Sequence, residues 1–268
     1  MFSKFFEKFF LYIVLFYSFI PFLWIILASF DETPQLWITT VDFTFKNFIK
    51  LIFSKEALLW FLNSTIYALG TLFLVLIASA LGGYTLSRIN VWWKAPFLYF
   101  ILLIRIIPGT TYLVPRFKMI NSMGLLDTYF SVILIDAAEA LPIGIWIMKT
   151  FYDTINKELE EAVWIDGGNR FTSLTRVVFP LSLPAVAAVS ILTFTSSWGT
   201  FLTPLLFITS PSKIPLGIAI YRAYVTPQTI DFAFMAALSM LYMIPAIALF
   251  IFFRKYLIKS FNIAGVNG

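Results

Sequence analysis

The segment Glu160–Asn169 reads EEAVWIDGGN, and Phe179–Pro184 reads FPLSLP. Asn156 can cap a helix here, and the acidic residues that follow it suit the N-terminal end of a helix dipole. Gly167 or Gly168 supplies the left-handed residue that ends such a helix. A second short helix follows, and two prolines then redirect the chain. The sequence therefore predicts a helix, a sharp glycine turn and a second helix.

This polar segment lies in a chain that is otherwise apolar. Of its 268 residues, 60% are hydrophobic and 12% are charged, and the mean hydropathy is +0.89. A soluble domain of this size could not cover so much apolar surface, which predicts an integral membrane protein. The chain has neither Cys nor His. Their absence excludes disulfides, Cys/His metal sites and a Ser-His-Asp triad. The net charge of +5 reports membrane topology and not affinity for nucleic acid.

Six apolar segments are long enough to cross a bilayer, since a helical span needs ~20 residues. The first is predicted to be an uncleaved helix, because it is longer than the apolar region of a secretory signal. The chain then forms one transmembrane domain over residues 1–268, all α-helical. Small residues at positions 78, 79, 82 and 83 predict close helix packing. The predicted spans are 9–30, 57–86, 95–115, 128–149, 181–208 and 232–253.

Basic residues set the predicted orientation. The connections that hold Arg88, Lys149 and Arg254 carry more Lys and Arg than those on the opposite side. The positive-inside rule places both termini in the cytoplasm, together with a loop at 151–180 and a tail at 254–268.

Two interpretations of the cytoplasmic loop are open. An amphipathic hairpin could rest on the lipid headgroups. Anionic lipid would repel its acidic side chains, however, which favours a protein partner with a basic cleft. The acidic side chains are Glu158, Glu160, Glu161 and Asp166.

Glu161-Ala162-Val163, with Asp166-Gly167 and then Phe179-Pro180, resembles the EAA loop of ATP-binding cassette (ABC) importer permeases. Val163 stands where the family usually has a second Ala, and Asn156 stands where it often has Pro. The resemblance covers nearly the whole chain and is closest to the second permease of carbohydrate systems of the maltose type. Further matching segments are Asn63-Ser64, Arg105–Gly109, Gly124–Tyr129 and the tail from Tyr256 to Gly268.

The resemblance implies the six-helix fold of a type I ABC importer permease, with a cytoplasmic coupling helix seated in an ATPase subunit. Glu161 would contact that subunit, and Gly167 would let the loop turn. The implied partners are a homologous second permease, two cytoplasmic ATPase subunits, a sugar-binding protein and membrane lipid. ATP and Mg²⁺ would be bound by the ATPase, because this chain has no phosphate-binding loop of its own. The residues implied in coupling are Glu160, Glu161, Ala162, Asp166, Gly167 and Gly168.

Ionisable residues inside spans are candidate functional groups. Asp136 and Glu139 share a helix face and could line a solute path, or either could pair with Arg105. The hydroxyls and the indole of the fifth span suit a sugar, although small residues there could equally serve helix packing. The solute-path candidates are Asp136, Glu139, Ser196, Ser197, Trp198 and Thr200.

The external loop 209–231 would meet the sugar-binding protein by resemblance, or would be a plain connection. Its candidate contacts are Ser210, Pro211, Ser212 and Lys213. The leading hypothesis is a non-catalytic permease subunit of an ATP-driven, binding-protein-dependent sugar importer in the cell membrane. The alternative is an ion-coupled secondary carrier that uses Asp136 and Glu139.

Overall fold

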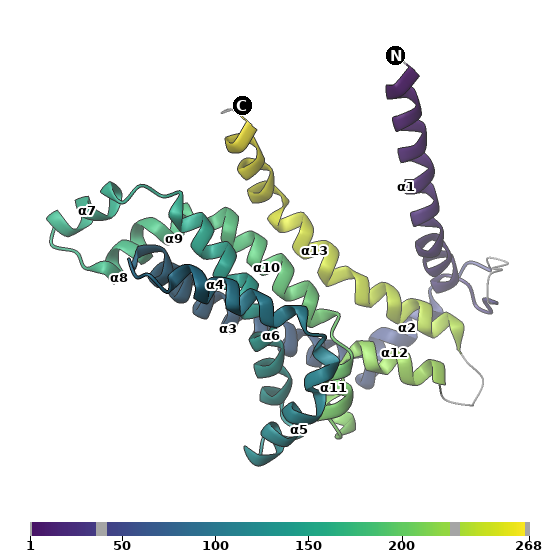
Figure 1. The fold of residues 1–268 in the computed structure, drawn as a ribbon. Helices are drawn as coiled ribbons and strands as arrows, with labels where there is room; N and C mark the ends of the chain where they lie inside the picture. Colours follow the sequence, from purple (N-terminus) through teal and green to yellow (C-terminus); the bar gives the residue numbers. More distant parts are fainter. Residues whose placement is uncertain (1, 36–41, 226–230, 266–268) are drawn as a thin grey trace. The chain divides into compact units, whose positions relative to one another are not determined.

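A computed structural model describes residues 2–35, 42–225 and 231–265, and the side chains within 6–35, 42–225 and 231–255. The regular structure of these residues is helical apart from isolated bridges such as Asp31–Phe43. The chain divides into two compact units (Figure 1). Unit 1 comprises residues 1–62 and 215–245, and unit 2 comprises 63–214 and 246–268.

Unit 1 contains a long N-terminal helix and a small apolar core. The core joins Leu51, Ala57, Leu216, Ala237 and Leu238, all buried. Lys50 donates to Asp231 at 2.6 Å across the two sequence segments of this unit. Its helices are α1 (Phe2–Ser29), α2 (Lys46–Phe53), the first turns of α3 (Lys55–Arg88), α12 (Leu216–Val225) and the first part of α13 (Phe232–Gly265).

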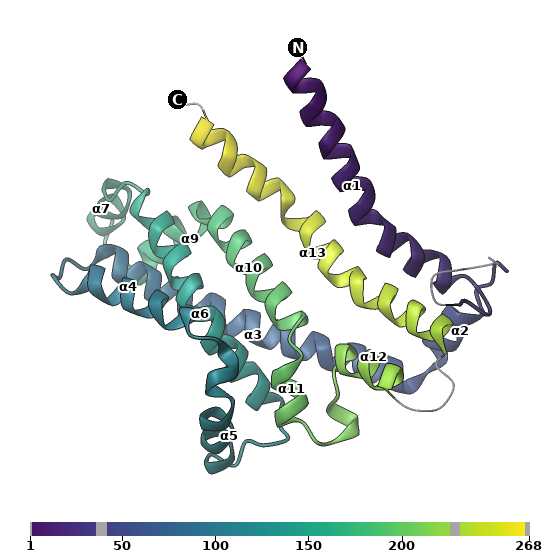
Figure 2. The same cartoon turned by 45° about the vertical axis from the view of Figure 1, so that its right-hand side comes forward.

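Unit 2 holds the predicted coupling loop. Figure 1 shows α7 and α8 at one end of this unit, with α5 and α11 at the other end, and Figure 2 shows α7, α5 and α11 in the same arrangement. Its elements are the rest of α3, α4 (Lys94–Leu103), α5 (Leu113–Ser122), α6 (Tyr129–Asp153), α7 (Glu158–Ile165), α8 (Arg170–Ser173), the π-helical turn η3 (Leu174–Val178), α9 (Phe179–Leu181), α10 (Leu183–Trp198), α11 (Leu202–Phe207) and the remainder of α13.

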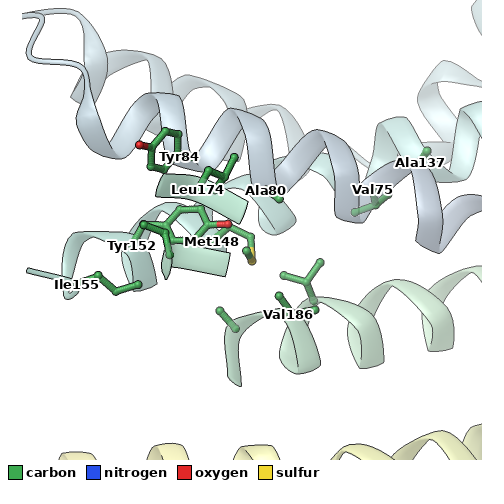
Figure 3. Close-up of a cluster of buried hydrophobic side chains, with 12 residues drawn as sticks. Val75, Ala80, Tyr84, Ala137, Met148, Tyr152, Ile155, Leu174 and Val186 are labelled. Carbon is green, nitrogen blue, oxygen red and sulfur yellow. The ribbon is translucent and has the colours of Figure 1, made fainter. Parts of the chain in front are cut away.

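In the main hydrophobic core of unit 2, the segment that follows the glycine turn packs against α3 and α6 (Figure 3). Tyr84 of α3, Met148 and Tyr152 of α6, and Leu174 and Val178 of η3 are all buried in it. The Tyr84 and Tyr152 rings meet edge to face, with their centroids 6.1 Å apart. The segment that follows the glycine turn is thereby packed against α3 and α6.

Close approach of α3 and α6 depends on glycine. A Cβ at Gly83 would lie 2.8 Å from Met148 Cβ and 2.9 Å from the backbone nitrogen of Lys149. A Cβ at Gly144 would lie 3.1 Å from Ser79 Cβ. The predicted packing role of the small residues in the second span is therefore confirmed.

Four described helices are long and apolar enough to cross a membrane: Phe6–Ser29, Lys55–Arg88, Tyr129–Asp153 and Phe232–Lys255. Two further pairs of helices would bring the number to six if each bent pair counts as one span. The first pair, Lys94–Ile106 with Gly109–Ser122, bends by 89°, and the second, Arg170–Leu181 with Leu183–Trp198, bends by 77°.

Three predicted segments differ from the structure in detail. The fifth predicted span, 181–208, is interrupted between Trp198, where α10 ends, and Leu202, where α11 begins, and the interruption starts at Gly199, a poor helix former. The third predicted span, 95–115, is broken at Ile107 and Pro108, because proline has no backbone N–H and restricts the residue before it. The external segment 209–231 was predicted as a loop but contains helix α12, whose apolar residues Leu216, Ile218 and Ala219 are buried. The predicted tail match at 256–268 lies outside the residues whose side chains are described.

Candidate functional site

Helix α7 ends as predicted, but its N-cap is Lys157, one residue after the predicted Asn156. The Asn156 side chain accepts a hydrogen bond from the backbone N–H of Glu158 at 3.2 Å, and three acidic residues occupy the first turn. At the other end, Gly167 adopts φ +82° and donates to the Trp164 carbonyl at 3.1 Å. Gly168 donates to the Val163 carbonyl at 2.8 Å. The left-handed residue is therefore Gly167.

Gly168 is needed for a different reason. A Cβ at this position would lie 2.5 Å from Val163 Cγ1 and 2.9 Å from the Val163 carbonyl oxygen. The chain could not close back over α7 with any other residue here without moving the backbone. The Asn169 side chain then caps α8 by accepting from the backbone N–H of Thr172 at 2.9 Å.

Most of the surface of α7 is exposed and mixed in character. Ile165 is 86% exposed, and Leu159 and Trp164 are each more than 40% exposed. Glu161 and Asp166 are exposed beside them. Large apolar side chains grouped on a short surface helix mark an interaction surface.

The Glu160 side chain points toward α3 instead of toward solvent. The residue is only 1% exposed. One carboxylate oxygen accepts from Arg88 Nε at 2.5 Å, and the other accepts from the Tyr84 hydroxyl at 2.5 Å. Arg88 also donates to the carbonyl oxygens of Tyr152 at 3.0 Å and Ile155 at 3.4 Å. A single carboxylate thus joins α7 to the ends of α3 and α6.

A second polar contact lies beside the first. The Ser87 hydroxyl donates to Asp153 at 2.7 Å, and Lys149 pairs with the same carboxylate at 2.6 Å. Arg88 donates to the Ser87 hydroxyl at 2.9 Å. The ends of α3 and α6 are therefore joined by side chains even without α7.

The polar residues of the spans fall into two groups. Asp136 is buried and accepts from the Ser197 hydroxyl at 2.9 Å, while Ser197 lies 3.2 Å from the Thr71 hydroxyl. Thr200 is a more distant donor to Asp136, at 3.5 Å. Trp198 is also buried, with its ring stacked on Phe194. Asp136, Ser197 and Trp198 are therefore buried between helices, and Thr200 is half-buried beside them.

Ser196 belongs to the second group and lines a cavity of about 380 Å³. The walls of this cavity come from three segments: Arg105 at the break in the third span, Gly144 of α6, and Thr193 and Thr195 of α10. Glu139 and Arg105 line a neighbouring hollow of about 210 Å³.

Neither predicted pairing of Arg105 is formed. Glu139 forms an ion pair with Arg116 of α5, and Asp136 is hydrogen-bonded to hydroxyl groups. Within the described part of the chain, Arg105 has no ion-pair partner. Arg105 and Glu139 line the same hollow, but the Glu139 carboxylate is paired with Arg116 and not with Arg105.

The external segment 209–214 is anchored at several points. Asp127 accepts from the backbone N–H groups of Thr209 at 3.0 Å and Ser210 at 2.9 Å, from the Ser210 hydroxyl, and from Lys213 at 3.2 Å. Asn63 donates to the carbonyl oxygens of residues 212 and 214 at 2.9 and 3.0 Å. Lys213 is thus directed to Asp127, while Pro211 and Ser212 are exposed.

We expect this anchor to make stability depend on pH. Hydrogen bonds from Ser210, then from Thr209 and Lys213, hold the pKa of Asp127 well below its ordinary value of 3.8. A lowered folded-state pKa adds stability above the unfolded value of ~3.9 and loses it as the pH falls further. Asp127→Asn should therefore lower the melting temperature at pH 7. The difference from the parent protein should shrink below about pH 4, as measured by thermal unfolding in detergent.

Asn can adopt the positive φ of 56° found at Asp127, so this substitution changes the charge without straining the backbone. A melting-temperature difference that is equal at pH 3 and pH 7 would show that the Asp127 charge does not hold the segment.

Comparison with known proteins gives the family. The sequence profile of the family described as "binding-protein-dependent transport system inner membrane component" matches residues 75–263, which include α7, the glycine turn and α10. The chain belongs to this family. Members are non-catalytic permease subunits of importers. The predicted family and function class are confirmed, and they exclude the ion-coupled carrier as the class of this protein.

Relatives of the permease match more than nine-tenths of its length. It is 28% identical to the sulfoquinovosyl glycerol transport system permease protein of Agrobacterium fabrum, over 92% of this chain and 88% of that protein. It is 31% identical to the arabinooligosaccharides transport system permease protein of Halalkalibacterium halodurans, over 95% and 93%.

The fold is also that of a solved importer. A chain of a bacterial ABC transporter involved in the import of the acidic polysaccharide alginate superposes with a TM-score of 0.82, covering 95% of this chain and 96% of that one at 22% identity. The predicted all-α importer fold is therefore confirmed. Among the described residues, no group of three acidic side chains is placed to bind a metal ion.

Tyr84 and Arg88 are site residues of the permease that the sequence analysis did not single out. The positive-inside rule placed Arg88 on the same side of the membrane as the acidic loop, which makes it a candidate partner for a loop carboxylate. Its pairing with Glu160 was hidden, because Glu160 and Glu161 are adjacent, identical and equally suited to a helix N-terminus.

Proposed function

We propose that this permease carries a sugar across the cell membrane as half of a translocation path driven by a separate ATPase. The carrying observation is α7, a short helix that exposes Ile165 and Glu161 next to a fixed glycine turn. Because this chain has no ATP-binding loop, it needs a surface on which a separate ATPase can dock and to which that ATPase can transmit its movement. The two curated relatives described above are named for sugar-containing solutes, which supports a sugar as the cargo.

The proposed ATPase contacts are Glu161, Ala162 and Asp166 on the exposed face of α7, with Gly167 and Gly168 shaping the turn. Two ATPase subunits would bind ATP with Mg²⁺, and this chain would hold neither. Closure of the ATPase pair around ATP would move α7 and shift the spans between inward-open and outward-open states. A second permease would supply the other half of the path. This arrangement requires α7, the C-terminal tail and both termini to be cytoplasmic.

The proposed solute path runs along the cavity lined by Ser196, Thr193 and Arg105. Hydroxyl and guanidinium groups suit the hydroxyl-rich surface of a sugar. Glu139 lies at the neighbouring hollow and belongs to the same proposed lining. Four other candidates would instead hold the lining helices in place by packing and hydrogen bonding: Asp136, Ser197, Trp198 and Thr200.

A sugar-binding protein would dock on the external segment that contains Ser210, Pro211, Ser212 and Lys213. The anchoring by Asp127 and Asn63 keeps this segment in one conformation, which lowers the entropy lost on docking. Lys213 would take part mainly by holding the segment, because its ammonium group already contacts Asp127.

The direct test is reconstitution of the complete transporter in vesicles. Uptake should require external binding protein and ATP on the α7 side. Glu161→Ala should lower solute-stimulated ATP turnover about 10-fold, a loss of ~1.4 kcal/mol. Glu158→Ala is the matched control, since Glu158 is an exposed carboxylate on the same helix, and it should retain more than half of the turnover.

Two outcomes would contradict the proposal. Uptake by this chain alone, without ATP, would contradict a path driven by a separate ATPase. Equal effects of Glu161→Ala and Glu158→Ala would show that Glu161 does not contact the ATPase.

A further inference from the structure

Glu160 and Glu161 are adjacent in the sequence but face different surroundings. Glu161 is exposed on α7, whereas Glu160 is 1% exposed and both of its carboxylate oxygens accept hydrogen bonds from α3. Burial of a carboxylate is costly unless it is paired and hydrogen-bonded. Arg88 and Tyr84 meet that requirement, so the contact is specific.

This contact matters because the exposed apolar residues of α7 do not attach it to the spans. Leu159, Trp164 and Ile165 all have more than 40% of their surface exposed. Val163, on the inner side, packs against the glycine turn. The ion pair of Glu160 with Arg88 is therefore a direct side-chain connection from α7 to a membrane span.

The connection reaches two spans at once. Arg88 is the last residue of α3, and its other guanidinium nitrogens donate to the carbonyl oxygens of Tyr152, in the last turn of α6, and of Ile155 just after it. The Tyr152 carbonyl also accepts from the backbone N–H of Ile155 at 3.2 Å, so Arg88 adds a side-chain donor to the end of α6. A movement of Glu160 would pull on the ends of α3 and α6 together.

On the far side of the glycine turn the attachment is different. The segment Arg170–Leu181 meets α10 at an angle of 77°, with the change of direction at Ser182. The π-helical turn Leu174–Val178 lies within that segment, and such turns are frequent at functional sites. The Glu160 side chain therefore attaches α7 to α3 and α6. The segment Arg170–Leu181, in contrast, continues into α10 through the bend at Ser182.

We propose that Glu160 is a positioning residue, and that its ion pair with Arg88 and hydrogen bond from Tyr84 transmit the movement of α7 to α3 and α6. On this proposal Glu161 binds the ATPase and Glu160 passes the resulting movement inward. This inference rests on the proposed function of α7. It assigns separate steps to the two glutamates, and those steps can be measured separately.

The experiment uses the complete transporter in vesicles and measures solute imported per ATP hydrolysed. Glu160→Gln keeps the shape of the side chain but removes the charge that pairs with Arg88. We expect the ATPase to co-purify at more than half of its usual amount and to keep hydrolysing ATP. The ratio of solute to ATP should fall at least 5-fold. Glu158→Gln, on the same helix but exposed, should leave the ratio unchanged.

Two further variants test the partners. Arg88→Gln should lower the ratio as Glu160→Gln does, and combining the two should add little, because both remove one contact. Tyr84→Phe deletes a single hydroxyl and should lower the ratio about 2-fold. It provides the measurement if the charge-removing variants do not assemble.

Three results would overturn the inference. A parallel fall of uptake and ATP turnover with an unchanged ratio would mean that Glu160 only stabilises the fold. Loss of ATPase co-purification in Glu160→Gln, together with an unchanged ratio in Tyr84→Phe, would mean that Glu160 serves assembly and not transmission. An unchanged ratio in Tyr84→Phe and Glu160→Gln alike would remove its role in transmission. Failure of the proposed function itself is recognised separately, because the parent transporter would then show no ATP-dependent uptake.

Discussion

Replacing Gly168 with Ala is expected to reduce ATP-driven uptake by about 10- to 100-fold, equivalent to ~1.4–2.8 kcal/mol. The added Cβ would lie 2.5 Å from Val163 Cγ1 and 2.9 Å from the Val163 carbonyl oxygen. The Val163 side chain could rotate away, but its carbonyl belongs to the backbone of α7. Relief of the clash therefore moves α7 and breaks the 2.8 Å hydrogen bond from Gly168 to Val163. Solute uptake into vesicles and the amount of co-purified ATPase are the measurements.

The chain offers two controls for this substitution. Gly167 and Gly124 both adopt positive φ, +82° and +68°, and neither has an atom within 4 Å of an added Cβ. Ala at either position costs ~1–2 kcal/mol of local strain without a clash. Gly124→Ala, near the external segment, should leave ATPase co-purification unchanged, and Gly167→Ala should have an intermediate effect. Equal loss of co-purification in Gly124→Ala and Gly168→Ala would show that general destabilisation, and not the geometry of the turn, is responsible.

Local sequence patterns predicted much of this site. The acidic first turn of α7, its termination at a glycine and the second short helix all depend on neighbouring residues, so capping and propensity are sufficient to find them. The apolar segments similarly predicted the four long apolar helices, because the length requirement of a bilayer is independent of tertiary packing, but they did not predict the breaks within 95–115 and 181–208. The break at Pro108 is a local effect too, because proline has no backbone N–H, although the span 95–115 was predicted as continuous.

The direction of individual side chains could not be predicted in this way. Glu160 and Glu161 differ only in which side of α7 they occupy relative to α3, and that depends on packing between segments more than 70 residues apart. Asp136 and Ser196 were likewise grouped as path candidates. The structure buries Asp136 against Ser197 and leaves Ser196 in a cavity wall. Periodicity identifies a helix face but does not identify its neighbour.

Replacing Ile165 with Asp is expected to reduce ATPase co-purification about 100-fold, a loss of ~2.8 kcal/mol in docking. Ile165 is 86% exposed in the isolated chain. Burying such a side chain in a partner cleft contributes ~1.5–3 kcal/mol. An unpaired carboxylate in the same cleft would lose that contribution and add a desolvation cost. The affinity of purified ATPase subunit for the permease in detergent is the measurement.

Ile165→Leu is the matched control, because it keeps the apolar volume and should retain affinity within about 3-fold. The substitution also separates docking from transmission. Ile165→Asp should lower ATPase binding while leaving the Glu160–Arg88 ion pair in place, whereas Glu160→Gln should leave binding in place and lower the solute-to-ATP ratio. If Ile165→Asp instead leaves ATPase affinity unchanged, this face of α7 rests against lipid headgroups. The ATPase would then bind through Glu161 and Asp166 alone. Its affinity would fall as the salt concentration rises, because salt screens contacts between exposed charges.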